Sequence, residues 1–259
     1  MSNKGYYAGS ELKITASIEA RFSSSRLPGK VLNKVCGIPV LSHMVRRLKR
    51  SSFIDKIVIA TTTNPKDIAI CELAKQEGVD YFQGSEDDVL ARVVDCHERA
   101  GSDVIVELTG DCPLIDVYWV DRVIEKFLEN KWDFVSNCIP MTFPRGLDCK
   151  AFWYKDLKWM ADNIKDMAVR EHVSLHYYEK KGRYKLGSIE SPDWLKYPDY
   201  RWTLDTKEDL EFISKIYEAL YTKDNYFNSW DIMHLLKKSP ELLTINKDIA
   251  QKPIRCGAK

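Results

Sequence analysis

Several features of membrane, secreted and zinc-binding proteins are missing from this sequence. It contains no run of about 18 apolar residues, the length that a membrane-spanning helix requires. Residues 1–7 lack the apolar core of a secretory signal. The 7 cysteines are odd in number and never form a CxxC pair, which argues against a disulfide framework and a zinc site. We therefore expect a reduced, cytoplasmic protein that does not associate with a membrane.

An excess of positive charge is also missing. The 39 lysine and arginine residues nearly cancel the 38 aspartate and glutamate residues, and the net charge is +1. A nucleic-acid-binding protein would need a large positive field, so we expect no nucleic-acid partner. An anionic ligand must instead be met by a local cluster of cations. Neither the GxSxG motif of serine hydrolases nor the GxxxxGK[ST] motif of P-loops occurs.

The N-terminal half of the 259 residues does contain a regular alternation of apolar strands and amphipathic helices. Predicted strands cover residues 12–18, 56–60, 79–82, 103–108 and 132–136. Predicted helices cover residues 39–49, 65–77, 85–100 and 116–130. This order predicts a three-layer, Rossmann-like α/β fold, in which a mostly parallel sheet is covered by helices on both faces.

The C-terminal half is less regular. We expect a turn at residues 143–148 and then, in order, a strand at 149–153, helices at 155–164 and 167–180, a strand at 184–190, and helices at 206–220 and 229–236. Because no linker or internal repeat is visible, we expect a single domain over residues 13–246 with a small β-rich insertion. Residues 1–12 are expected to form a flexible N-terminus, and residues 247–259 an irregular tail.

The most informative segment follows the first long strand. Residues 20–30 read A-R-F-S-S-S-R-L-P-G-K and contain three cations, Arg21, Arg26 and Lys30. Backbone N–H groups, hydroxyls and cations can wrap the oxygens of a triphosphate and offset its charge. The Pro28-Gly29 pair fixes a bend and lets the backbone approach closely. A solvated basic loop is the alternative, but ligands of parallel α/β sheets bind beyond the carboxyl ends of the strands, where this loop lies.

Two aspartates from other segments are candidate metal ligands. Asp111 follows the predicted strand at 103–108, and Asp205 precedes the predicted helix at 206–220. Mg²⁺ prefers one or two carboxylates, with phosphate oxygens and water completing its shell. The alternatives are that Asp111 caps the next turn and that Asp205 is the N-cap of its helix. If Thr206 and Asp209 form the capping pair instead, Asp205 remains free to bind a metal.

Weaker candidates lie in the C-terminal half. His172, in the sequence R-E-H-V, is as well explained by a place on a helix face or in the core as by a substrate contact. The aromatic residues between Tyr177 and Trp202 belong either to the core or to a sugar-binding or interface surface.

Together these segments resemble the cytidylyltransferase family, which includes the 3-deoxy-manno-octulosonate (KDO) cytidylyltransferases and the SpsF-type spore-coat polysaccharide proteins. The shared opening, A-R-x-x-S-x-R-L-P-G-K, corresponds to residues 20–30. Further matches are A-T-T at 60–62, G-S-E-D-D-V-L-A-R at 84–92, T-G-D-C-P-L-I at 109–115, G-L-D at 146–148, R-E-H-V at 170–173 and T-L-D at 203–205. Glu19 departs from the family pattern, because the relatives usually carry Gln or Pro there.

The resemblance implies a nucleotide-diphosphosugar transferase fold, CTP as the donor and Mg²⁺ as the cofactor. Its catalytic residues would be Arg21 and Lys30 on the triphosphate, and Asp111 and Asp205 on the metal. The nucleotide-binding set would comprise Ala20, Arg21, Ser23, Arg26, Gly29, Lys30, Thr61, Ser85, Arg92 and Asp111. The acceptor would contact Gly146, Asp148, Arg170, Glu171 and His172.

These residues predict an enzyme that transfers CMP from CTP to an acidic sugar or a related acceptor, releases pyrophosphate and serves surface-glycan biosynthesis. Two alternatives remain. One is a nucleotidyltransferase of the same fold that uses another NTP, or a phosphonate or sugar-phosphate acceptor. The other is a catalytically silent nucleotide-binding protein. The family resemblance also implies a homodimer.

Overall fold

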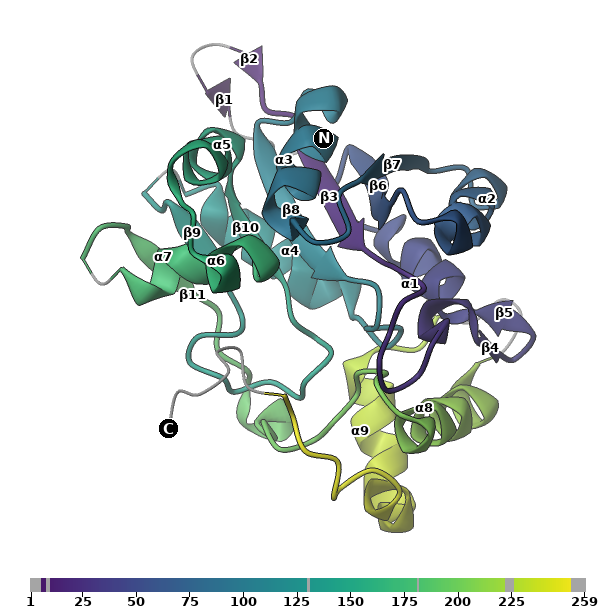
Figure 1. Cartoon of the computed structure of the whole chain (residues 1–259). Coiled ribbons are helices and arrows are strands. Elements are labelled where there is room, and N and C mark those ends of the chain that lie inside the picture. The colour runs from purple at the N-terminus through teal and green to yellow at the C-terminus, as the bar shows by residue number, and fades with distance from the viewer. Residues whose placement is uncertain (1–5, 8–9, 130, 181, 222–225, 253–259) are drawn as a thin grey trace.

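A seven-stranded sheet forms the centre of the computed structural model, which describes residues 6–7, 10–129, 131–180, 182–221 and 226–252 (Figure 1). Its spatial order is β11-β9-β10-β8-β3-β6-β7. The bounds are β3 (Ile14–Glu19), β6 (Lys56–Thr62), β7 (Asp80–Gly84), β8 (Val104–Thr109), β9 (Phe134–Ser136), β10 (Lys150–Trp153) and β11 (Leu186–Ser188). Only β10 runs antiparallel to its neighbours among these strands. The predicted mostly parallel α/β sheet is confirmed, and the strands of the C-terminal half extend it.

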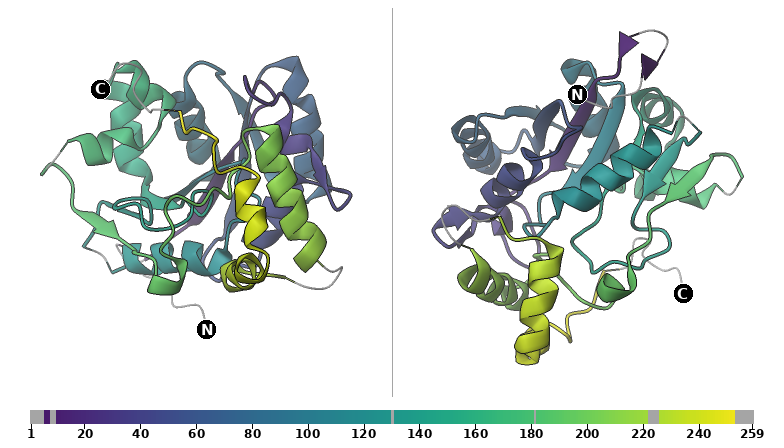
Figure 2. Two further views of the ribbon diagram at one scale, coloured as in Figure 1. Left: turned by 90° about the horizontal axis from the view of Figure 1, so that it is seen from below. Right: turned by 180° about the vertical axis from the view of Figure 1, so that it is seen from behind.

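Helices cover both faces of the sheet (Figures 1 and 2). One face carries α3 (Val89–Ala100), α5 (Tyr154–Asn163), α6 (Met167–Glu171) and α7 (Leu175–Glu179), and the other carries α1 (Val40–Leu48), α2 (Ile68–Gln76) and α4 (Val117–Phe127). Ile14, Ala16 and Ile18 of β3 are fully buried in the same core as the apolar sides of α1, α2 and α4. Successive strand residues point to opposite faces, so the alternate residues of β3, ending at Glu19, face α3.

A second core lies beyond the carboxyl ends of the parallel strands. It includes α8 (Lys207–Leu220) and α9 (Ser229–Lys238), which lie side by side in Figure 2. The apolar sides of both helices share a core with the buried Trp202 and Phe227. This core brings the chain before α8 beside the loop after β8: the Leu204 N–H donates to the carbonyl of Asp111 at 2.8 Å. The packing of α8 therefore places Asp205 near the ends of β3 and β8.

Two predicted helices have different limits in the structure. The helix expected from Ser85 begins at Val89, because the Asp88 side chain caps it by accepting a hydrogen bond from the Ala91 N–H at 3.0 Å. The prediction of one helix at residues 167–180 is wrong, because residues 172–174 separate two short helices, α6 and α7. Val173 there has a positive φ of 20° and is buried in the core under these helices. Burial of this side chain therefore outweighs the helical pattern.

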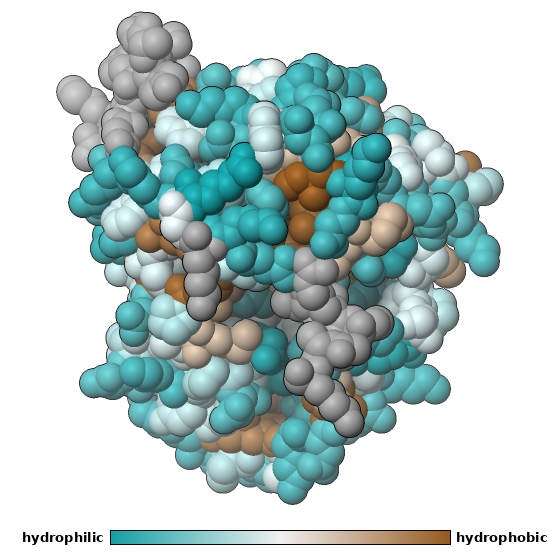
Figure 3. Space-filling model, turned by 60° about the vertical axis from the view of Figure 1, so that its left-hand side comes forward, coloured by the Kyte–Doolittle hydropathy of each residue, from teal (hydrophilic) through white to brown (hydrophobic). Residues whose placement is uncertain are grey.

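Short elements complete the fold. They are the paired strands β1 (Tyr6–Tyr7) with β2 (Ser10–Glu11), the paired strands β4 (Lys34–Val35) with β5 (Ile38–Pro39), and the 3-10 helices η1 (Lys30–Leu32), η2 (Pro65–Asp67), η3 (Asp193–Leu195) and η4 (Pro240–Thr244). Parts of the predicted N-terminus and tail, residues 1–5, 8–9 and 253–259, lie outside the described residues. Over the described ranges, no helix combines the length and apolarity needed to cross a membrane. The face in Figure 3 is mainly hydrophilic, with small scattered apolar areas and a hollow near its middle.

Candidate active site

A cavity of about 630 Å³ lies where β3 and β8 end. Its walls come from the loop after β3, the loop after β8, the start of α3, the end of α6 and the residues before α8. A cavity of this size lies within the usual range for small-molecule sites, about 300–1,000 Å³. Of the predicted site residues, its lining includes Ala20, Arg21, Ser23, Arg26, Lys30, Arg92, Asp111, Asp148, Glu171, His172 and Asp205.

The loop after β3 is held in a folded-back shape. The Phe22 N–H donates to the buried Asp67 carboxylate at 2.7 Å, and the Gly29 N–H donates to the carbonyl of Phe22 at 2.8 Å. Gly29 has a φ of 69°, and an added Cβ would lie 2.8 Å from the ring of Phe22. Only glycine tolerates both conditions. These contacts fix where Lys30, the next residue, leaves the loop.

Lys30 joins the two candidate metal ligands. Its ammonium nitrogen lies 2.6 Å from Oδ2 of Asp111 and 2.8 Å from Oδ1 of Asp205. The three side chains come from three segments that are far apart in the chain. Burial acts to lower the pKa of Lys30, but the two carboxylates outweigh burial and raise that pKa above its ordinary value. Lys30 is therefore charged, and both carboxylates face one point.

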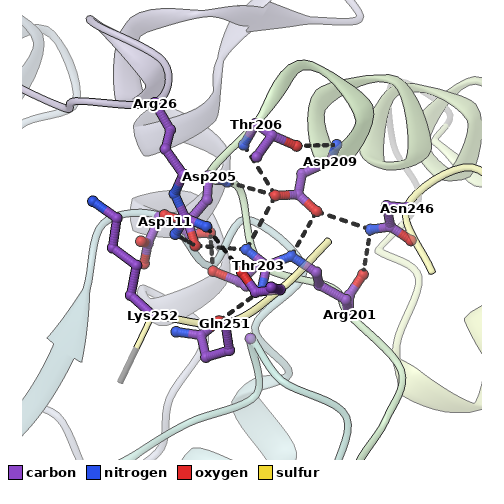
Figure 4. A network of polar contacts seen from close by, with 12 residues as sticks. Arg26, Asp111, Arg201, Thr203, Asp205, Thr206, Asp209, Asn246, Gln251 and Lys252 are labelled. Atoms are coloured by element: carbon purple, nitrogen blue, oxygen red, sulfur yellow. Dashed lines mark hydrogen bonds and ion pairs between the residues drawn. The ribbon is translucent and has the colours of Figure 1, made fainter. Parts of the chain in front are cut away.

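Asp205 contacts two further cations in the network drawn in Figure 4. Its Oδ2 lies 2.7 Å from Nη2 of Arg26 and 2.6 Å from Nη2 of Arg201. Burial acts to raise the pKa of Asp205, but Lys30, Arg201 and Arg26 together lower that pKa below its ordinary value. The carboxylate is thus ionised under neutral conditions, as a metal ligand must be.

Asp205 does not cap α8. The Asp209 N–H donates to the Thr206 hydroxyl at 3.3 Å, and the Asp209 carboxylate accepts from the Thr206 N–H at 3.0 Å. This reciprocal pair is a capping box. The interpretation that Thr206 and Asp209 form the cap, with the Asp205 side chain left to other partners, is therefore confirmed.

The donor set around Lys30 fits Mg²⁺. A metal site built from three or more His, Cys, Asp or Glu side chains does not occur in the described part of the chain, so a metal here would have fewer protein ligands. Asp111 and Asp205 supply two carboxylates that converge on one cation, which matches the preference of Mg²⁺ for few protein ligands plus phosphate and water. An all-protein cage of the kind that binds zinc or calcium is not formed by these residues.

The wall on the α3 side carries Arg21, Ser23, Arg92 and Glu19. Ser23 donates to the Glu86 carboxylate, and Arg21 lies 4.0 Å from it. Arg92 donates to the carbonyl of Ser85, while its buried Nε has no hydrogen-bond partner among the described residues. Oε1 of Glu19 is also buried, and the described part of the chain supplies no hydrogen-bond partner for it. Buried polar atoms are normally hydrogen-bonded, so a water molecule or a polar ligand at this wall can satisfy these two atoms.

The remaining predicted residues lie off the cavity lining. Thr61 is fully buried in β6, and Ser85 accepts from the Asp88 N–H at 3.1 Å. Gly146 packs against the backbone of residue 202, which an added Cβ would approach to 2.6 Å. Arg170 forms an ion pair with Asp88 at 2.6 Å. Gly29, Gly146 and Arg170 are therefore placed to shape the walls, while Asp148, Glu171 and His172 reach the cavity itself.

Sequence reasoning missed residues whose partners are distant. Asp67 anchors the loop after β3, and Arg201 holds Asp205 and Asp209 together. Gln251 and Lys252 of the predicted irregular tail line the cavity. Arg201 lies two residues before the T-L-D sequence at 203–205, but nothing in the local sequence shows that its side chain contacts Asp205 and Asp209. Nothing in the local sequence of residues 250–252 indicates a site.

The model of the family described as cytidylyltransferase matches residues 15–232 of this chain. An uncharacterized protein of Methanocaldococcus jannaschii is 36% identical over 246 residues, covering 94% of this chain and 98% of that protein. The spore coat polysaccharide biosynthesis protein SpsF of Bacillus subtilis is 31% identical over 233 residues, covering 88% and 95%. The predicted family resemblance is confirmed.

A solved structure agrees with these sequence comparisons. The cytidylyltransferase from Leptospira borgpetersenii superposes with a TM-score of 0.85 at 31% identity, covering 94% of this chain and 100% of that one. The similarity in fold therefore extends over most of this chain.

Proposed function

Because this chain belongs to the cytidylyltransferase family and is a CTP-dependent nucleotidyltransferase, we propose that it transfers CMP to a small acidic, sugar-like acceptor and releases pyrophosphate. The observation that carries this proposal is the contact of one ammonium group, that of Lys30, with both Asp111 and Asp205. It brings a cation and two carboxylates to one point in a cavity.

The triphosphate would bind along the loop after β3. Arg21, Arg26 and Lys30 line the cavity together with the hydroxyl groups of residues 23–25. Charge-assisted hydrogen bonds of this kind are about twice as strong as neutral ones. The loop is prearranged by Asp67 and Gly29, so little ordering would be needed when the nucleotide binds. Lys30 and Arg21 would stabilise the pyrophosphate as it leaves.

Asp111 and Asp205 would hold Mg²⁺. When bound, the metal would polarise the α-phosphate and offset the charge that develops there. The protein's own residues fix the two carboxylates: Arg201 contacts Asp205, and Thr109 donates to Asp111 at 2.7 Å. Because both carboxylates already face one point, the chain supplies positioning and charge rather than a covalent intermediate.

The acceptor would occupy the part of the cavity bordered by Asp148, Glu171 and His172. Arg145 and Arg92 also line the cavity, and Nε of Arg92, which has no hydrogen-bond partner in the described ranges, can donate to an acid group. This mixture of acceptors and cations suits a polyhydroxylated acid, whose hydroxyls donate and whose carboxylate accepts. In the reaction, an acceptor oxygen attacks the α-phosphorus of CTP, and the bond from that phosphorus to the pyrophosphate breaks.

The names of relatives support the same acceptor class and pathway. The chain is similar to a KDO cytidylyltransferase and to a spore coat polysaccharide protein. We therefore place the product in surface-glycan biosynthesis. The family resemblance also supports a homodimer, and the scattered cysteines support a cytoplasmic location.

A pyrophosphate-release screen tests the proposed function. The purified protein is incubated with Mg²⁺, each of the four NTPs and a panel of sugar acids, sugar phosphates and phosphonates. We expect turnover with CTP and a sugar acid. Turnover with another NTP or another acceptor class would show a different nucleotidyltransferase. No turnover, together with no thermal stabilisation by any NTP, would contradict the proposal, because a ligand that binds the native state raises its stability.

A further inference from the structure

The C-terminal segment after η4 is attached to the residues that hold Asp205. The side chain of Asn246, which is 4% exposed, donates from Nδ2 to the carbonyl of Arg201 at 2.9 Å and to Oδ1 of Asp209 at 3.0 Å. Asp209 forms the capping box of α8 with Thr206, and Arg201 contacts Asp205. Asn246 therefore fixes the start of this segment against the rigid end of a helix.

The next residues cross to the loop after β3, as Figure 4 shows for Gln251 and Lys252. The carbonyl of Ala250 accepts from Nη1 of Arg26 at 3.3 Å. Oε1 of Gln251 accepts from Nη1 of Arg201 at 2.6 Å, and Nζ of Lys252 donates to the hydroxyl of Ser25 at 2.8 Å. The segment thus spans the cavity from the α8 side to the phosphate loop.

The ammonium group of Lys252 has a different kind of partner from the three other cations around Asp205. Lys30, Arg26 and Arg201 each lie against a carboxylate, which offsets part of their charge. The described partner of the Lys252 ammonium group is the neutral hydroxyl of Ser25. Two of its three N–H groups can therefore serve a ligand, and its charge is not offset at that contact.

We infer that the C-terminal segment completes the triphosphate site, with Lys252 as a phosphate-binding residue and Gln251 as a positioning residue for Arg201. This inference rests on the proposed function, since it assumes a nucleoside triphosphate in the cavity. Lys252 lies beside Ser25, in the middle of the loop that would wrap the phosphates, and it lines the same cavity as Lys30 and Asp205. The residues matched by the family model end at 232, so this part of the site lies outside the matched region.

Calorimetric titration of CTP, with Mg²⁺ at low ionic strength, tests the inference on the full chain. The variants are Lys252→Gln, Lys252→Arg and, as a matched control, Lys247→Gln. Lys247 belongs to the same segment and is exposed, but it does not line the cavity. We expect Lys252→Gln to weaken CTP binding about tenfold, as loss of one charge-assisted contact does. Lys252→Arg should retain most of the affinity, and Lys247→Gln should bind as the wild type does.

The outcomes separate this inference from the proposed function. If the wild-type protein binds CTP and Lys252→Gln binds it equally well, the inference is wrong and the proposed function stands. Equal losses in Lys252→Gln and Lys247→Gln would also overturn it, because they would show only an effect of net charge. If the wild-type protein binds no NTP, both fail. Raising the salt concentration should reduce the difference in CTP affinity between the wild type and Lys252→Gln, since Lys252 is solvent-exposed and salt screens its charge.

Discussion

Nζ of Lys30 lies 2.8 Å from Oδ1 of Asp205, although 175 residues separate them in the sequence. The first residue ends the loop after β3, and the second precedes α8. Their contact joins the two parts of the molecule that would hold the phosphates and the metal.

Removing the ammonium group of Lys30 should abolish most of the activity. We expect Lys30→Ala to fold but to lose about 10²–10³-fold in turnover, because a prearranged charge that stabilises the transition state is lost. The measurement is steady-state pyrophosphate release with the acceptor found in the screen. Lys34→Ala, an exposed lysine four residues away, is the control and should retain activity. Turnover by Lys30→Ala near the wild-type rate would contradict this role.

Neutralising one carboxylate should change the metal dependence. We expect a chelator to abolish turnover and added Mg²⁺ to restore it. Asp111→Asn should need a higher Mg²⁺ concentration for half-maximal activity and have a lower maximal rate, because one of two protein ligands loses its charge. The measurement is activity against Mg²⁺ concentration. An unchanged Mg²⁺ curve for Asp111→Asn would exclude this residue as a ligand.

Gly146 should be required for the fold rather than for acceptor contact. Its φ is 101°, and an added Cβ would lie 2.6 Å from the carbonyl carbon of residue 202. We expect Gly146→Ala to lower the free energy of unfolding by roughly 2–4 kcal/mol through backbone strain and overlap. Gly37→Ala is the control: its φ is 77°, but no atom of the described residues lies within 4 Å of the added Cβ. Gly37→Ala should lower the free energy of unfolding by only about 1 kcal/mol. Equal losses in urea unfolding would show that overlap is unimportant.

Glu19 should make the stability depend on pH. Burial, with further contributions from Glu107, raises the pKa of Glu19 from 4.5 to about 8, and Lys150 and Arg92 only partly oppose this. Asp111 acts in the same direction as Glu107. Because the pKa is higher in the folded protein, the folded state binds the proton more tightly. The free energy of unfolding should therefore fall as the pH rises from 4.5 to about 8.

The variant Glu19→Gln isolates this effect, because glutamine resembles the protonated acid. We expect its advantage in stability over the wild type to be small near the lower end of this pH range. The advantage should grow to roughly 2–4 kcal/mol at the upper end. Urea unfolding at several pH values measures the difference. A difference that does not vary with pH would show that Glu19 is ionised throughout.

Much of the fold follows from local sequence patterns. The strands β3, β6 and β8 and the helices α1 and α4 lie close to their predicted ranges, because each has a strong apolar periodicity. The break at Val173 was not predictable in this way. It depends on how that side chain packs in a core shared with α3 and α5, which belong to other segments of the chain.

The residues of the candidate site also fall into those that sequence motifs predict and those that only the structure reveals. Lys30, Asp111 and Asp205 stand in motifs at strand ends or helix starts, so the sequence predicts that they belong to one site, though not that Lys30 contacts both carboxylates. Asp67 and Lys252 stand in no motif and contact the phosphate loop across 45 and 227 residues. Arg170 lies in a motif, but its partner, Asp88, directs it into the wall of the cavity. Long-range pairing of this kind can be found only from the structure.

The most direct test of the account follows the phosphorus atoms of CTP. The protein is incubated with Mg²⁺, a sugar-acid acceptor, and CTP labelled either at the α-phosphate or at the γ-phosphate, and the products are separated by chromatography. We predict that the α label appears in a CMP-linked acceptor and that the γ label appears in pyrophosphate. Release of the α label as free CMP, or transfer of the γ label to the acceptor, would contradict attack on the α-phosphorus by the acceptor.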